Sequence, residues 1–191
     1  MRVITGRARG AKLNAPKGER TRPTSERAKE AVFSMLQFDI ADRYVLDLFA
    51  GSGQMGIEAL SRGARGAVFC DVSKDAVAVV RENLKKTRLE EISEVYSMDA
   101  LALLRSLSAK KRFGLVFLDP PYAAGLLPKV LSLLLEFDLL EDGAKIVCES
   151  AATEDVFAGD GALASHFTLQ KEVHYGIACV TVLGFCKGGE T

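Results

Sequence analysis

The chain has 191 residues, of which 48% are hydrophobic and 26% are charged, and its formal net charge is zero. These values are ordinary for one globular domain with a sizeable core. No run of eighteen apolar residues is present, which argues against a membrane span, and no apolar stretch follows the basic start, which argues against a secretory signal. We therefore expect a cytoplasmic protein that has no membrane partner.

Positive charge gathers at the start of the chain. Residues 1–22 carry seven lysines and arginines against one acid, Glu19. A basic segment on an acidic body favours contact with a polyanion, whereas a solvated terminus is the simpler interpretation. Apolar residues near Val3 and Leu13, separated by glycines, favour a short strand pair. We expect a basic β-hairpin arm over 1–22 and a main domain over 23–191.

Helix and strand patterns alternate through the main domain. Helices are predicted over 25–36, 55–61, 74–86, 100–107 and 128–137, and strands over 44–49, 67–70, 94–97, 113–118 and 145–148. A weakly helical pattern covers 153–163, and an antiparallel hairpin is predicted over 167–173 and 177–185. The alternation implies a Rossmann-like α/β fold, with a doubly wound, mostly parallel seven-stranded sheet and the antiparallel C-terminal hairpin at one edge.

A glycine-rich loop follows the first predicted strand. Gly51, Gly53 and Gly56 match G-x-G-x-x-G ahead of a helix, and Asp71 stands twenty residues after Gly51, at the end of the next strand. Glycines let a backbone approach a ligand closely, and a carboxylate at this distance can accept from both ribose hydroxyls. The pattern indicates a nucleoside cofactor, although Asp71 by itself could be a turn residue.

Acids near this loop bear on which cofactor it binds. Asp47 precedes the glycines, where it would repel a pyrophosphate and suit a cation. S-adenosylmethionine carries an ammonium and a sulfonium and has no phosphate, so it fits better than a dinucleotide. Asp99, after the third strand, could accept from the adenine amine or cap the helix that begins at Ala100; both interpretations stay open.

A second motif follows the apolar strand over 113–118. Asp119, Pro120, Pro121 and Tyr122 leave that strand in sequence. The prolines hold the backbone stiff, so a carboxylate, a fixed carbonyl and an aromatic ring meet at the edge where open α/β sheets bind ligands. The motif could therefore contact a ligand at this edge. The simpler interpretation is a plain turn with a surface tyrosine.

These residues resemble a known family. The segment 47–56 with Asp71 and Asp99 is similar to class I S-adenosylmethionine-dependent methyltransferases, and the motif 119–122 is similar to their amino-methylating motif. The match is closer to the RsmD family, bacterial enzymes that methylate guanine N2 in 16S ribosomal RNA. The segments that carry this closer resemblance are 2–6, 9–13, 22–24, 29–33, 49–53 and 56–64.

The family resemblance extends from about Arg2 to Phe185 and implies a cofactor, a substrate and a set of site residues. Many relatives carry glutamate where this chain has Asp71. The cofactor implied is S-adenosyl-L-methionine, with S-adenosylhomocysteine as product, and the partner implied is 16S rRNA within a small ribosomal subunit or an assembly intermediate. The cofactor-binding residues implied are Asp47, Phe49, Ala50, Gly51, Ser52, Gly53, Gly56, Asp71, Val72, Asp99 and Ala100. The catalytic residues implied are Asp119, Pro120, Pro121 and Tyr122: Asp119 and the Pro120 carbonyl would accept the two N–H bonds of a planar amine, and Tyr122 would stack on the base. The RNA-binding residues expected in the basic arm are Arg7, Arg9, Lys12 and Arg22.

Other classes of function remain to be weighed. A DNA or RNA adenine-N6 methyltransferase would use the same Asp-Pro-Pro-Tyr motif, so the motif alone leaves the base open. A dinucleotide-dependent oxidoreductase and an RNA-binding module without catalysis fit the two motifs poorly. Because the four cysteines form no C-x-x-C pair and only two histidines are present, we expect free thiols, no disulfide and no metal site. We also expect a monomer.

Overall fold

The computed structural model describes residues 1–16, 23–107, 111–121 and 125–187, so Arg22 and Tyr122 lie outside the described residues. The strands are β1 (Tyr44–Asp47), β2 (Gly66–Asp71), β3 (Ser93–Ser97), β4 (Phe113–Leu118), β5 (Leu140–Ala151), β6 (Phe167–Tyr175) and β7 (Ala178–Phe185). The helices are α1 (Pro23–Met35), α2 (Gln54–Ser61), α3 (Lys74–Thr87), α4 (Ala100–Leu107), α5 (Leu127–Glu136) and α6 (Gly161–Ala164), with a 3-10 turn η1 (Glu90–Ile92).

One seven-stranded sheet organises the chain, in the order β3-β2-β1-β4-β5-β7-β6. The pairs among β1 to β5 are parallel, and β7 is antiparallel to both β5 and β6. This confirms the predicted doubly wound sheet with an antiparallel C-terminal hairpin. The chain order reverses at β1, where neighbouring connections leave on opposite faces, and ligands of open α/β sheets bind at such a point.

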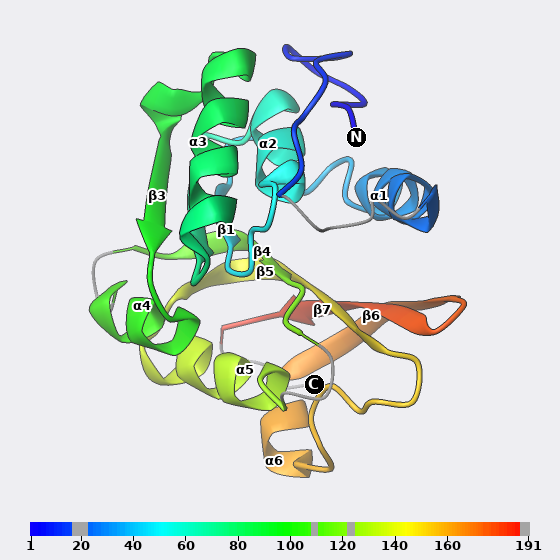
Figure 1. Ribbon diagram of the computed structural model, residues 1–191. Coiled ribbons are helices and arrows are strands. Elements are labelled where there is room, and N and C mark those ends of the chain that lie inside the picture. Colours follow the sequence, from blue (N-terminus) through cyan, green and yellow to red (C-terminus); the bar gives the residue numbers. More distant parts are fainter. Residues whose placement is uncertain (17–22, 108–110, 122–124, 188–191) are drawn as a thin grey trace.

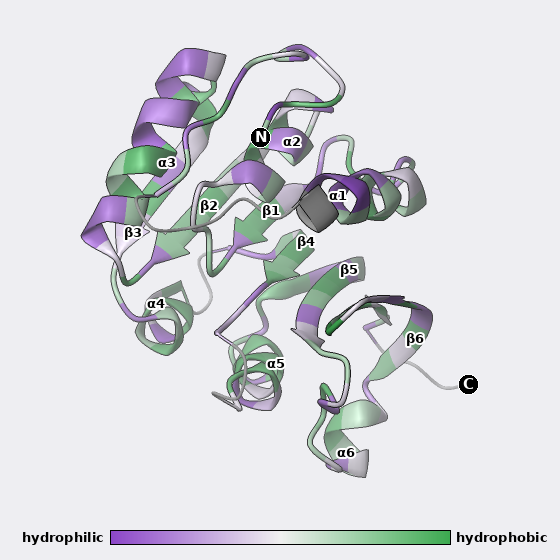
Figure 2. Ribbon diagram, turned by 45° about the vertical axis from the view of Figure 1, so that its right-hand side comes forward, coloured by the Kyte–Doolittle hydropathy of each residue, from purple (hydrophilic) through white to green (hydrophobic). Residues whose placement is uncertain are grey.

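Helices cover both faces of the sheet (Figure 1). Residues 1–16 and α1 to α3 lie on one face, and α4 to α6 lie on the other. All six residues of β4 are buried, as expected for a strand covered on both sides. Figure 2 shows the central strands as hydrophobic, whereas α3 carries hydrophilic residues as well. No helix in the described parts of the chain is long and apolar enough to cross a membrane.

Local signals account for several element boundaries. The Ser73 hydroxyl accepts a hydrogen bond from the backbone N–H of Ala76 at 3.3 Å, so it caps α3 as predicted. Lys85 and Lys86 lie in the last turn of that helix, where positive charge is favoured by the helix dipole. The predictions for β4 and α4 match the observed bounds, because each is a compact apolar pattern.

Several predicted elements differ from the observed bounds by one or two residues, and two are wrong by more. The strand predicted over 145–148 spans Leu140–Ala151, because β5 pairs with β4 on one side and β7 on the other. The weak helix predicted over 153–163 is reduced to Gly161–Ala164. Ahead of it the Asp155 carboxylate accepts from the N–H groups of Phe157 and Gly159, at 3.0 and 2.7 Å, which stabilises a turn in place of a helix.

The N-terminal segment follows a hairpin path that packs on the main domain. Its two sides meet at one antiparallel bridge, between Arg2 and Lys12, and form no regular strand. The side chains of Val3, Ala8 and Leu13 are buried in the same core cluster as α1, α2 and α3. These three side chains anchor residues 1–16 to the hydrophobic core on this face.

Candidate active site

Acidic side chains stand where each parallel strand reaches the carboxyl edge of the sheet. Asp71 and Asp47 end β2 and β1, Asp99 follows β3, Asp119 follows β4, and Glu149 lies where β5 passes the end of β4. The first three were predicted to bind the cofactor and the fourth the acceptor amine. Their alignment along one edge is consistent with a single site across β3, β2, β1, β4 and β5.

Asp47 is buried beneath the glycine loop. Its Oδ2 accepts a hydrogen bond from the backbone N–H of Gly56 at 2.9 Å, which ties the end of β1 to the first turn of α2. Burial raises the pKa of Asp47 to about 7; the Gly56 N–H opposes this rise, and the negative charge of Asp71 adds to it. A cationic ligand group near this carboxyl would favour its ionised form.

Asp71 holds the neighbouring turn. Its Oδ2 accepts from the N–H of Gly51 at 2.9 Å and its Oδ1 from the N–H of Ser73 at 2.8 Å. The turn interpretation of Asp71 is thus confirmed, and a carboxylate with about four lone-pair sites can still accept from a ribose. Val72 follows it with 78% of its surface exposed, which offers an apolar face beside the loop.

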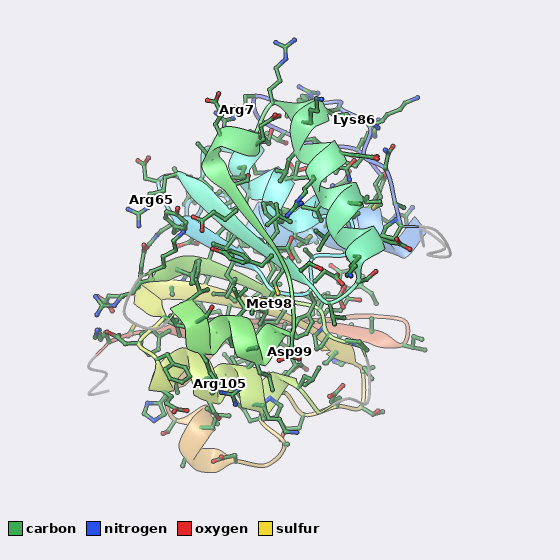
Figure 3. The ribbon with its side chains drawn as sticks, turned by 60° about the vertical axis from the view of Figure 1, so that its left-hand side comes forward. Arg7, Arg65, Lys86, Met98, Asp99 and Arg105 are labelled. Carbon is green, nitrogen blue, oxygen red and sulfur yellow. The ribbon has the colours of Figure 1, made fainter. Side chains whose placement is uncertain are left out.

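Asp99 caps α4. Its Oδ1 accepts from the N–H of Ala102 at 2.9 Å, which confirms the helix-cap interpretation, while its contact with adenine stays a prediction. Ala100, the first residue of α4, is buried. Figure 3 shows Met98 and Asp99 at the lower edge of β3, away from the end of the molecule that carries Arg7 and Lys86.

The glycine loop is held from several sides. The N–H of Ala50 donates to the carbonyl of Cys70 at 2.9 Å, and Gly53 begins α2 without a side-chain cap, at φ 75°. A Cβ on Gly56 would stand 2.3 Å from the Phe69 ring, so only glycine allows α2 to pack this closely on β2. Phe49 is half-buried against the core, and Ser52 is buried.

Asn83 is a loop-positioning residue that the sequence patterns missed. Its Nδ2 donates to the carbonyls of Ser52, at 2.9 Å, and Asn14, at 3.0 Å. Its Oδ1 accepts from the N–H of Asn14 at 2.8 Å. This fully buried amide joins α3, the glycine loop and the N-terminal segment. The sequence does contain one sign of this role, because Asn83 is a polar residue within the apolar stripe of α3, between Val80 and Leu84.

A cavity of about 290 Å³ opens beside Asp119. It lies between α1, the start of α2, the ends of β4 and β5, and the turn between β6 and β7. Apolar side chains supply most of its lining, among them Val32, Phe117, Val147, Ile177 and Val180, and its polar lining residues include Lys29, Gln54, Asp119 and Glu149. Pro120 is buried and Pro121 exposed, whereas Tyr122 lies beyond the described residues.

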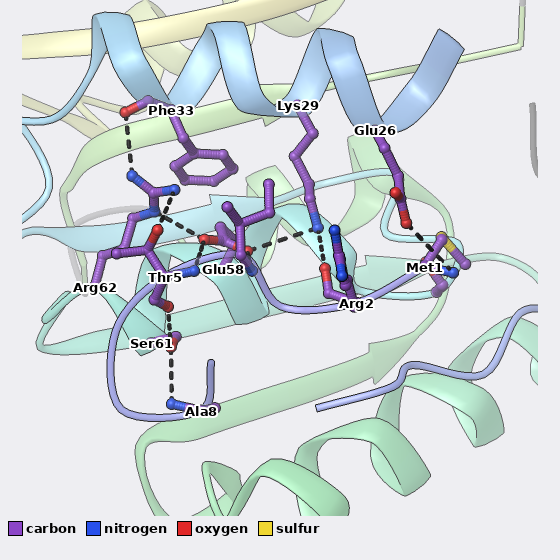
Figure 4. Close-up of polar contacts among 12 residues, drawn as sticks. Met1, Arg2, Thr5, Ala8, Glu26, Lys29, Phe33, Glu58, Ser61 and Arg62 are labelled. Atoms are coloured by element: carbon purple, nitrogen blue, oxygen red, sulfur yellow. Dashed lines mark hydrogen bonds and ion pairs between the residues drawn. The ribbon is translucent and has the colours of Figure 1, made fainter. Parts of the chain in front are cut away.

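A buried ionic cluster supports one wall of this cavity (Figure 4). Lys29 Nζ donates to the carbonyl of Arg2 at 2.7 Å and lies 3.6 Å from Glu58 Oε2. Burial lowers the pKa of Lys29, and the charge of Glu58 opposes that change. Glu58 accepts hydrogen bonds from the N–H groups of Ile4, at 2.7 Å, and Thr5, at 3.0 Å, and from Arg62 Nε, at 2.8 Å. The cluster joins the N-terminal segment to α1 and α2.

None of the arm's basic residues within the described segment 1–16 lines this cavity. The N–H of Arg7 donates to the carbonyl of Ser61, at the end of α2, whereas Gln54 at the start of α2 lines the cavity. Eight helical residues separate these ends by roughly 10 Å. Arg9 and Lys12 are exposed, and Arg22 lies outside the described residues.

Comparisons with known proteins agree with this site. The family model described as "Conserved hypothetical protein 95" matches residues 1–183. "Ribosomal RNA small subunit methyltransferase D" of Haemophilus influenzae is 35% identical over 178 residues, which cover 93% of this chain and 90% of that protein. The protein of the same name from Escherichia coli K12 is 36% identical over 150 residues, covering 78% of this chain and 74% of that protein. A solved structure named "Putative methyltransferase yhhF from Escherichia coli" has a TM-score of 0.84 and 32% identity, covering 97% of this chain and 98% of that one.

The fold and the site define an S-adenosylmethionine-dependent methyltransferase of the Rossmann-like class. The residues at the loop suit that cofactor, because the buried Asp47 carboxyl just before the glycines suits a cation and would repel a pyrophosphate. Within this class, the chain belongs to the RsmD family.

Proposed function

We propose that this protein transfers the methyl group of S-adenosylmethionine to the exocyclic N2 amine of a guanine in the 16S rRNA of the small ribosomal subunit. The observation that carries the proposal is the cavity beside Asp119, which opens at the same sheet edge as the glycine loop. The relatives named as rRNA small subunit methyltransferases support the choice of substrate.

The cofactor supplies the methyl group, and the chain supplies its binding site. Asp47 would face the ammonium, Asp71 the ribose hydroxyls and Asp99 the adenine amine. Backbone N–H groups already orient each carboxylate. Gly56 donates to Asp47, Gly51 and Ser73 donate to Asp71, and Ala102 donates to Asp99. A preorganised site of this kind costs little reorganisation when the cofactor binds.

The acceptor amine needs two hydrogen-bond acceptors. The guanine N2 lone pair is delocalised into the ring, so the amine must be held in line with the methyl–sulfonium bond. The Asp119 carboxylate would accept one N–H and the carbonyl of Pro120, fixed by the ring of Pro121, would accept the other. Both acceptors bind more strongly as the nitrogen gains positive charge, which lowers the barrier. The methylated ammonium is acidic and releases its proton after transfer.

RNA binding would involve two further parts of the chain. Tyr122, outside the described residues, would stack on the extruded base; such stacking is worth about 1–3 kcal/mol and offsets part of the cost of unstacking. The arm over residues 1–22 would bind phosphates through Arg7, Arg9, Lys12 and Arg22. Because Arg7 lies at the far end of α2 from the cavity, its phosphate would belong to RNA away from the target nucleotide.

Methyl transfer to isolated small-subunit particles and to naked 16S rRNA tests the proposal. With methyl-labelled cofactor, nucleoside analysis is expected to find N2-methylguanosine. Asp119→Ala is expected to abolish transfer while calorimetry shows unchanged cofactor binding, and the exposed Asp142→Ala serves as a matched control. N6-methyladenosine as product would favour the adenine alternative, and a preference for NAD over S-adenosylmethionine would contradict the cofactor assignment.

A further inference from the structure

A second carboxylate lies beside Asp119 at the cavity. In the parallel pair of β4 and β5, Phe117 is the register partner of Val147 and Leu118 is the partner of Cys148. The next residue on each strand is acidic, Asp119 on one and Glu149 on the other. Neighbouring strands lie about 4.8 Å apart, so Asp119, which directly follows β4, lies beside Glu149 within β5.

Both acids face the cavity. Side chains two residues apart on a strand point to the same face. Phe117 and Val147 belong to the core cluster on the face that α1 covers, so Asp119 and Glu149 project on that face as well, and both line the cavity. Each strand thus contributes to the cavity lining a buried apolar residue and, two positions later, a more exposed carboxylate.

Gln54 adds a further acceptor to this lining. Its Oε1 is buried and, among the residues that the structure describes, has no hydrogen-bond partner. A buried amide oxygen left in this state is costly, and a ligand N–H would satisfy it. Asp119, Glu149 and Gln54 thus place three acceptors on the lining, while the Lys29 ammonium is already engaged by the Arg2 carbonyl and Glu58. This polar lining suits a ligand edge that is rich in donors.

Among the amino bases of RNA, guanine has such an edge. Its N2 amine is flanked by the ring N1–H, a second donor, whereas the N6 amine of adenine and the N4 amine of cytosine are flanked by ring nitrogens that carry lone pairs. A carboxylate beside the reacting amine attracts N1–H and repels a lone pair. A carboxylate has about four lone-pair sites, so Glu149 can accept from a base while it keeps contacts within the protein.

We propose that Glu149 is the residue that selects guanine, by accepting its N1–H while Asp119 holds the neighbouring N2 amine. This inference rests on the proposed function and adds to it the physical cause of base choice, which the Asp-Pro-Pro-Tyr motif leaves open. The acceptor is a guanine base, bound over Phe117, Val147 and Val180 with its Watson–Crick edge towards the two carboxylates.

The test uses small-subunit particles reconstituted with rRNA that carries either guanine or 2-aminopurine at the nucleotide methylated by the wild type. 2-Aminopurine keeps the N2 amine and lacks N1–H. 2-Aminopurine cannot make the hydrogen bond from N1–H to the charged Glu149. We therefore expect the wild type to methylate guanine about 10- to 100-fold faster than 2-aminopurine. Glu149→Gln is expected to reduce this preference below about threefold, because the glutamine amide can also donate to N1.

Controls separate base selection from folding and from the reaction itself. Glu172→Gln, at an exposed glutamate on β6, is expected to keep the wild-type preference. Calorimetric binding of S-adenosylhomocysteine reports whether Glu149→Gln is folded, and Glu149→Ala provides a second variant. Equal wild-type rates on the two bases, or an unchanged preference in Glu149→Gln, overturn the inference and leave the proposed function standing. A wild-type product other than N2-methylguanosine overturns both.

Discussion

Lys29 Nζ lies 3.6 Å from Glu58 Oε2, and the two side chains are only 1% and 0% exposed. Glu58 also accepts from the N–H groups of Ile4 and Thr5, so one carboxylate on α2 holds α1 and the N-terminal segment together (Figure 4). An ion pair of this kind does not guarantee stability, but the removal of one partner leaves a buried charge without compensation.

Glu58→Gln is therefore expected to lower the free energy of unfolding by about 3–5 kcal/mol in urea titrations. Hydrogen exchange at the amides of Ile4 and Thr5 is expected to accelerate, because their acceptor loses its charge. Glu30→Gln, at an exposed position of α1, serves as the matched control and is expected to change stability by less than about 0.5 kcal/mol. A loss in Glu58→Gln no larger than in this control would contradict the role of the cluster.

The buried carboxyl of Asp47 is expected to make stability depend on pH. Burial raises its folded-state pKa from 3.8 to about 7. Between these values the folded protein binds a proton that the unfolded chain has released, so the stabilisation is complete below about pH 4 and is lost as the pH rises through about 7. Asp47→Asn removes this titration while its Oδ1 can still accept from Gly56.

The measurement compares urea titrations of both proteins from pH 4 to pH 8. Relative to Asp47→Asn, the wild type is expected to lose up to about 4 kcal/mol across this range. The comparison cancels the opposite contribution of Glu94, whose pKa is lowered chiefly by its hydrogen bond from Lys111. Parallel pH curves for the two proteins would show that Asp47 titrates at the same pH in the folded and unfolded states.

Asn83→Ala is expected to loosen the cofactor loop. The substitution leaves the carbonyl of Ser52 and the backbone of Asn14 without their partner, at a cost of about 2–4 kcal/mol in unfolding free energy. Calorimetry is expected to show weaker binding of S-adenosylhomocysteine by the folded variant. Asn14→Ala is the matched control, because Asn83 contacts only the backbone of residue 14. Wild-type affinity in Asn83→Ala would mean that the loop keeps its position without this amide.

Neutralising the arm is a sharper experiment than deleting it. Deletion would remove Val3, Ala8 and Leu13 from the core, whereas the side chains of Arg7, Arg9 and Lys12 are exposed. Replacing these three with alanine is expected to weaken RNA binding and to reduce the slope of log affinity against log salt by about 2–3.

If the triple variant keeps the thermal stability of the wild type, its weaker RNA binding arises from the lost charge and not from unfolding. Arg105→Ala, on α4 at the other end of the molecule from Arg7, is the control for a basic residue elsewhere (Figure 3). A triple variant with wild-type affinity and salt slope would remove the arm from the RNA interface.

Local sequence patterns correctly predicted the elements that depend on interactions between residues close together in the chain. The six-residue apolar run of β4 and the compact apolar pattern of α4 were predicted at their observed bounds, and Ser73 caps α3 as expected. The glycine loop and the acids at the strand ends were also found, because ligand edges of parallel sheets follow from strand order along the chain. The bounds of β4 and α4 and the Ser73 cap depend on residues within a few positions of one another.

The rest of the site required the tertiary structure. Asn83 meets Asn14 across 69 residues, Glu58 meets Ile4 across 54, and Glu149 comes beside Asp119 only through the register of β4 and β5. By itself the sequence determined the class of sheet and located the glycine loop, and it predicted the amine-binding role of residues 119–122. Only the folded chain decided which buried polar groups support that loop and which second carboxylate lies beside Asp119, since pairing between distant segments depends on packing and register and leaves no periodic pattern in either segment.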